Sequence, residues 1–211
     1  MEANELSLWQ LCLQGGIIMI PLAVLAVICI YIFVERLLAL HRAAGHDDPT
    51  FMYRIKDYIH EGEIESALNL CRTSPTPYAA LIAKGISRIG RPMQDVLVTI
   101  ENMGNLEIAR LGKGLPWLAT TAAGAPMLGF LGTVVGMVQA FHGMAASGSA
   151  ATLATFADGI YTALVTTVAG LVVGVAALFA YNYLVARINA VMTKLEGKTM
   201  EFMDMLNEPA E

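Results

Sequence analysis

Charged side chains are scarce in this sequence, and their absence from particular segments is informative. Asp, Glu, Lys and Arg make up 15% of the 211 residues, whereas a soluble domain has about 25%. The hydrophobic share is 56% and the net charge is −5. The low charge and high apolar content indicate a membrane protein. The mild negative charge gives no reason to expect a nucleic-acid partner.

Cysteine is also rare, and the sequence motifs that usually mark catalytic or metal sites are missing. Cys12, Cys29 and Cys71 stand far apart, with no metal-ligand or redox spacing. There is no phosphate loop, no HExxH pattern and no nucleophile elbow. We therefore expect no metal, no cofactor and no enzyme activity. The first 15 residues contain Glu2 and Glu5 but no Lys or Arg, so we expect the first apolar segment to be a retained span rather than a secretory signal.

Three apolar segments are long enough to cross a bilayer, which takes about 20 residues. We predict transmembrane helices over 16–38, 115–141 and 159–183, with Glu35-Arg36 ending the apolar part of the first. No Asp, Glu, Lys, Arg or His lies at the centre of any of them. Ion and proton relays inside membranes normally use an ionisable group. If this chain conducts protons, the titratable residue must come from a partner.

The basic residues predict the orientation. All 13 Lys and Arg lie between Arg36 and Lys113 or between Arg187 and Lys198. By the positive-inside rule, segments 1–15 and 142–158 face out, away from the cytoplasm. Segments 39–114 and 184–211 then lie in the cytoplasm.

The cytoplasmic middle region is expected to be helical. Asp48-Pro49 is typical of a helix N-terminus, with Asp48 as the N-cap and Pro49 in the first turn. Further helices are predicted over 61–72 and 77–90, and a fourth opens at Arg91-Pro92 and can run into the second span.

The C-terminal tail is predicted to continue the third span as one helix with a single apolar stripe. The stripe residues recur at steps of three, four and seven, as on one helix face: Leu184, Ile188, Val191, Leu195, Phe202 and Leu206. Two interpretations stay open. The stripe packs on the chain's own cytoplasmic helices, or it is buried between subunits.

The second and third spans each present a face of small residues with threonine among them. At 100° per residue, Gly129, Thr133 and Gly136 share one face of the second span, and Thr167, Gly170 and Gly174 share one face of the third. Thr162 and Thr166 form a polar strip beside the latter. Small faces let membrane helices pack closely, with hydroxyls bonding across helices or to the backbone. Alternatively, they border a narrow polar path or leave room for a helix of another protein.

Four stretches carry a family resemblance. TAAGAPMLGFLGTVVGMVQAF (121–141) closely resembles the second-span signature of the MotA/TolQ/ExbB proton-channel family, in its ExbB/TolQ branch. GIYTALVTTVAGLVVGVAALFAYN (159–182) resembles that branch's third span. Glu35-Arg36 is similar to the family's first-span exit, and 62–86 to its cytoplasmic helical repeat. The resemblance covers nearly the whole chain, and three spans fit this branch better than the four of MotA-type stators.

The resemblance implies an all-α integral protein of the bacterial inner membrane that assembles into a pentameric ring. The second and third spans would line a lumen that holds two single-span helices of an ExbD- or TolR-like partner, each supplying an Asp. Proton passage would be coupled to work on a TonB- or TolA-like protein. The family's pore threonines map onto Thr133 and Thr167, and Thr162 and Thr166 are expected on the same path. Four glycines are expected to pack the helices or to face the pore: Gly129, Gly136, Gly170 and Gly174.

One position departs from the family's pattern. Many members carry Glu in a Gly-Ile-x-Glu-Ala-Leu sequence, where this chain has Thr162. A pathway that relies on a carboxylate of the subunit therefore lacks that group, although Thr162 and Thr166 could order a file of water. A membrane scaffold without ion conduction is the alternative function. A secondary transporter is disfavoured because the chain has no internal repeat and no central charge.

Overall fold

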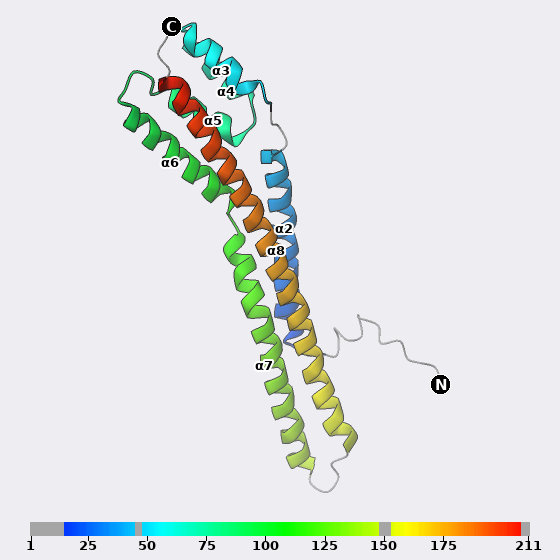
Figure 1. Ribbon diagram of the computed structural model, residues 1–211. Coiled ribbons are helices and arrows are strands. Elements are labelled where there is room, and N and C mark those ends of the chain that lie inside the picture. Colours follow the sequence, from blue (N-terminus) through cyan, green and yellow to red (C-terminus); the bar gives the residue numbers. More distant parts are fainter. Residues whose placement is uncertain (1–14, 45–47, 148–152, 208–211) are drawn as a thin grey trace. The chain divides into compact units, whose positions relative to one another are not determined.

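The computed structural model describes residues 15–44, 48–147 and 153–207 (Figure 1). Within these ranges the regular structure is entirely helical, with the following elements: α2 (Met19–Ala44), α3 (Phe51–His60), α4 (Ile64–Thr73), α5 (Pro77–Ile86), α6 (Met93–Leu111), α7 (Leu115–Ser147) and α8 (Leu153–Asn207). Three of them, α2, α7 and α8, are long and apolar enough to cross a membrane. The predicted all-α membrane fold is confirmed.

The chain divides into two compact units. The first contains the described residues up to Val34 together with Gly114–Asn182, and the second contains Glu35–Lys113 together with the residues from Tyr183 onward. Helices α2 and α8 each contribute to both units. The first unit thus holds the apolar helical segments, and the second holds the short helices α3 to α6.

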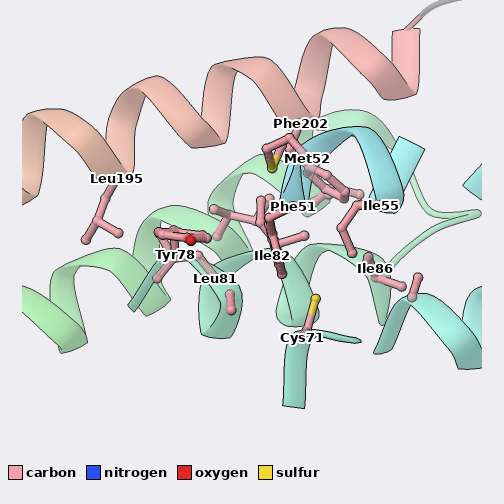
Figure 2. Packing of buried hydrophobic residues seen from close by; sticks show 14 residues of the cluster. Phe51, Met52, Ile55, Cys71, Tyr78, Leu81, Ile82, Ile86, Leu195 and Phe202 are labelled. Atoms are coloured by element: carbon pink, nitrogen blue, oxygen red, sulfur yellow. The ribbon is translucent and has the colours of Figure 1, made fainter. Parts of the chain in front are cut away.

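The second unit has a hydrophobic core of its own (Figure 2). The ring of Phe51 meets the ring of Tyr78 edge-on, with 5.2 Å between their centroids. Leu195 and Phe202 point from α8 into the cluster, in which Phe202 is fully buried. The other buried members come from α3 to α6: Met52, Ile55, Ala67, Cys71, Ala79, Leu81, Ile82, Ile86, Val96 and Ile100. The apolar stripe of the tail therefore packs on the chain's own helices, as the first of its two interpretations predicted.

The start of α3 differs from the prediction. The helix begins at Phe51 and the residue before it is Thr50, so Asp48 is not the N-cap. Oδ1 of Asp48 accepts hydrogen bonds from the Thr50 amide at 2.9 Å and from the Thr50 hydroxyl at 2.6 Å. The carboxylate thus closes a turn ahead of the helix. These two bonds hold the pKa of Asp48 below its ordinary value, because they favour the ionised form.

The α6–α7 junction is a break. Helix α6 ends at Leu111, and α7 begins at Leu115, instead of one helix running into the span. Gly114 has a φ of +92°, which side chains disfavour. A Cβ on Gly114 would also lie 3.2 Å from Cγ2 of Ile32. The left-handed glycine interrupts the helical hydrogen-bond ladder at this point.

Candidate functional site

Helices α7 and α8 meet backbone to backbone, because glycines leave out the side chains that would hold them apart. A Cβ added to Gly129 would lie 2.9 Å from the carbonyl oxygen of Thr166 and 3.1 Å from Cα of Thr167. A Cβ on Gly170 would lie only 2.5 Å from the carbonyl oxygen of Ala125. Real Cβ atoms essentially never come within 3.0 Å of a heavy atom of another helix. This contact is therefore possible only with glycine at both positions.

The same contact extends to the other two predicted glycines. A Cβ on Gly136 would lie 2.8 Å from Cβ of Ala163. A Cβ on Gly174 would lie 2.5 Å from Cγ of Pro126 and 3.1 Å from the carbonyl oxygen of Ala122. Pro126 has no N–H, so that carbonyl, four residues earlier, lacks its usual donor within the helix. These positions support the helix-packing interpretation of the small faces.

Threonine hydroxyls reinforce the glycine contact. Oγ1 of Thr167 on α8 donates to the carbonyl oxygen of Gly129 on α7 at 3.0 Å. Oγ1 of Thr166 donates to the carbonyl oxygen of Ala163 in its own helix at 2.7 Å and lies 3.4 Å from that of Gly129. Thr166 is only 2% exposed. It is therefore the predicted pathway residue that lies deepest in the helix contact.

The remaining predicted threonines are more accessible. Thr133 is half-buried on α7, and its hydroxyl donates to the carbonyl oxygen of Phe130 at 2.6 Å. Thr162 and Thr167 on α8 are also half-buried. The structure thus leaves three of the four predicted threonines partly open to whatever surrounds this unit.

Two residues of this region were not singled out by sequence reasoning. Gly132 lies one step from Thr133, off the predicted glycine face, yet a Cβ there would collide with the Thr166 side chain. The hydroxyl of Tyr161 is buried and has no hydrogen-bond partner among the described residues. Buried hydroxyls are usually paired. The only sequence signal for Gly132 is the unusual glycine content of the span, and none exists for Tyr161.

The hydroxyl geometry limits what this site can bind. A hydroxyl has one donor and two acceptor positions. Thr133 and Thr167 both use their donor on a backbone carbonyl, so each has acceptor positions left. They can accept a hydrogen bond from water or from a neutral carboxylic acid. A carboxylate has no proton to donate, and to bind it either hydroxyl would have to rotate off its carbonyl.

Acidic and basic side chains are absent from the apolar segments that form this site. The segments 16–34, 115–141 and 159–183 contain no Asp, Glu, Lys, Arg or His. In the part of the chain that the structure describes, no three His, Cys, Asp or Glu residues gather where they could hold a metal ion. Large apolar side chains cover much of the outer surface of the helices, among them Phe130, Val168 and Val172. Such a surface suits lipid or other apolar helices.

Comparison with known proteins extends the sequence resemblance. The profile of the MotA/TolQ/ExbB proton channel family matches residues 73–197, more than half of the chain. A biopolymer transport protein ExbB homolog of Methanothermobacter thermautotrophicus is 27% identical over 183 residues, which cover 87% of this chain and 64% of that protein. The Tol-Pal system protein TolQ of Haemophilus influenzae is 41% identical over 107 residues, 50% of this chain and 46% of TolQ.

A third relative, the biopolymer transport protein ExbB-like 1 of Synechocystis sp., is 29% identical over 181 residues, 82% of this chain and 69% of that protein. The matches thus span between about half and two thirds of the lengths of these relatives. Together with the three apolar helices, they confirm the resemblance seen in the span motifs. The chain is a membrane protein that belongs to the MotA/TolQ/ExbB proton channel family, in its ExbB/TolQ branch.

Proposed function

We propose that this chain is a proton-channel and stator subunit of the bacterial inner membrane. With an ExbD- or TolR-like single-span partner, it uses the proton motive force to energise a TonB- or TolA-type envelope process. The observation that carries the proposal is the α7–α8 contact. Thr133 and Thr167 keep acceptor positions on their hydroxyls, while the apolar segments around them contain no Asp, Glu, Lys, Arg or His.

The orientation and assembly are part of the same proposal. The distribution of Lys and Arg favours a periplasmic N-terminus and a cytoplasmic C-terminus. Family resemblance favours a pentameric ring in which α7 and α8 border a lumen. The partner helices inside that lumen would each supply one Asp, which this chain's spans lack.

The proposed mechanism follows from the cost of charge in a membrane. The partner Asp takes up a proton from the periplasmic side and becomes neutral, because an ionised carboxylate is costly in an apolar surrounding. The neutral acid then passes Thr133 and Thr167, whose hydroxyl oxygens accept its O–H. The proton is released on the cytoplasmic side. One charge that crosses 100 mV supplies about 2.3 kcal/mol, so a large mechanical step needs several protons.

The other two threonines have different parts in this proposal. Thr166 is buried in the helix contact, so we assign it to holding α7 against α8. Thr162 is half-buried and stands where many family members carry Glu. A hydroxyl there can order water but cannot carry the proton as a carboxylate does. The partner Asp is therefore the only carrier in this mechanism.

The test is proton flux into vesicles that contain the chain and its single-span partner, driven by a set membrane potential. Thr133→Val together with Thr167→Val removes both hydroxyls at nearly constant shape. Each hydrogen bond contributes about 1 kcal/mol, so the double change should lower the flux roughly thirtyfold. The matched control, Thr133→Ser with Thr167→Ser, keeps the hydroxyls and should keep most of the flux.

Size-exclusion chromatography establishes first that each variant assembles like the wild type. Flux that depends on the partner and falls only in the valine variant supports the proposal. Equal flux in the valine variant and the wild type would show that the hydroxyls do not serve the pathway. No flux from the wild-type complex would favour the alternative, a membrane scaffold in which the glycine faces only pack helices.

A further inference from the structure

A cavity of about 230 Å³ lies within the second unit, between the end of α2, the first turn of α5 and α8. Apolar and aromatic side chains form much of its wall, including Leu40 and Tyr78, both of which are nearly buried. From α8, the lining residues recur at spacings of three and four, so one helix face borders the cavity: Tyr183, Arg187, Ala190, Val191, Lys194 and Leu195.

The polar part of the wall is basic. His41 comes from α2, and Arg187 and Lys194 come from α8. Nε of Arg187 donates to the Tyr183 hydroxyl at 3.1 Å, and its guanidinium lies 5.4 Å from the centre of that ring. This contact orients a planar group whose remaining N–H donors match the geometry of phosphate oxygens.

The cavity lies where two apolar helices become polar. Leu37 and Leu40 follow directly on the apolar segment that Glu35-Arg36 ends. Tyr183 ends the apolar segment of α8, and Arg187 is the first charged residue after it. Both lining segments therefore begin at the level of a membrane surface. In the proposed orientation this surface is cytoplasmic, and basic pockets at such a surface favour anionic lipid headgroups.

We propose that this cavity binds the headgroup of an anionic phospholipid from the cytoplasmic leaflet. The phosphate lies between Arg187 and Lys194, with His41 on the facing wall, and the beginning of the acyl chains contacts Leu37 and Leu40. The proposal rests on the membrane orientation given above but not on proton conduction. Lipid retention and proton flux are measured separately, so either can fail without the other.

The test is native mass spectrometry of the delipidated full-length chain in detergent, titrated with phosphatidylglycerol, phosphatidylcholine or inorganic phosphate. We expect phosphatidylglycerol to be retained and phosphatidylcholine to be retained much less. Arg187→Gln with Lys194→Gln should lower phosphatidylglycerol retention at least tenfold, because two cations are removed from the phosphate. The matched control, Arg54→Gln with Arg91→Gln, removes two exposed charges that do not line the cavity and should have little effect.

A second variant fills the cavity without changing its charge. Ala190 lines the cavity, and Ala190→Phe should also abolish the preference for phosphatidylglycerol. Retention at the wild-type level in both cavity variants would overturn the proposal. An equal loss in the control pair would also overturn it, since it would indicate general surface attraction. Displacement of the lipid by inorganic phosphate would show a site for a small free anion instead.

Discussion

Gly170 offers the sharpest test of the contact between α7 and α8. A Cβ at this position would lie 2.5 Å from the carbonyl oxygen of Ala125, 2.9 Å from Cα of Gly129 and 3.0 Å from its nitrogen. All three are backbone atoms, so no side chain can rotate out of the way. In Gly170→Ala the two helices must move apart by roughly 1 Å, or the backbone must deform, and overpacking of this kind costs about 1–3 kcal/mol.

Two smaller effects change the expected free-energy cost of Gly170→Ala. The separation weakens the hydrogen bond from Thr167 to the Gly129 carbonyl, now 3.0 Å long. Such a bond between membrane helices contributes about 0.6 kcal/mol. In the opposite direction, alanine is favoured over glycine inside a helix by about 1 kcal/mol. The expected net result for Gly170→Ala is a loss of roughly 0.5–2.5 kcal/mol in the free energy of unfolding.

The measurement is unfolding of the purified chain in mixed dodecyl-maltoside and SDS micelles, followed by circular dichroism. Gly124→Ala and Gly143→Ala are the matched controls, because a Cβ at either position would meet nothing within 4 Å. They make the same chemical change within α7 and should be neutral or stabilising by up to about 1 kcal/mol. If Gly170→Ala unfolds at the same SDS fraction as these controls, the close approach of the helices is refuted.

Further predictions concern the second unit. Phe202→Ala should destabilise this unit by about 3–5 kcal/mol, because Phe202 is fully buried. Met200→Ala is the control and should change the stability little, because Met200 is 68% exposed. Limited proteolysis of residues 48–113 compares the two variants, and equal sensitivity to the protease would contradict the described core. Burial raises the pKa of the Cys71 thiol to about 11. In a variant whose other cysteines are replaced by alanine, maleimide should therefore modify Cys71 slowly at pH 8 and rapidly only after the chain is denatured. Rapid modification of the folded chain would argue against the burial of Cys71. An unfolded thiol ionises near pH 8.5, so the contribution of Cys71 to stability should fall as the pH rises from about 9 towards 11. Chemical denaturation at a series of pH values measures this fall. If the free energy of unfolding of Cys71→Ala declined just as steeply as that of the wild type, the prediction would be contradicted.

Long periodic segments could be predicted from the sequence because many residues carry the same signal. The apolar runs of α2, α7 and α8 and the spacing that buries Leu195 and Phe202 are of this kind. Single-residue boundaries were less predictable. The Asp48 carboxylate has a local alternative to capping, which is its pair of hydrogen bonds to Thr50. The break before α7 depends on the positive φ of Gly114. The sequence alone does not distinguish such a glycine from one that lies inside an apolar helix.

The candidate site could be predicted in outline but not in its pairings. A helical wheel gives the direction of a glycine face and says nothing of what lies opposite. It therefore left packing and pore lining open for Gly129 and Gly170, which the structure places against each other. Gly132 lies off the predicted face but still contacts Thr166, because α8 covers more than one row of α7 residues. The buried hydroxyl of Tyr161 depends on tertiary surroundings that the sequence does not display.

The glycine contact also has a genetic consequence. Every residue other than glycine carries a Cβ, so any missense change at one of the contact glycines places an atom within 3.0 Å of the opposite helix: Gly129, Gly136, Gly170 and Gly174. No conservative substitution exists at these positions, because even alanine adds the Cβ that collides with the opposite helix. Gly124, Gly143 and Gly197 lie on the same two helices, and a Cβ at any of them would meet nothing within 4 Å, so this contact does not oppose their replacement. We therefore expect the glycines that face the opposite helix to be conserved among related sequences, and those that face no neighbour to vary.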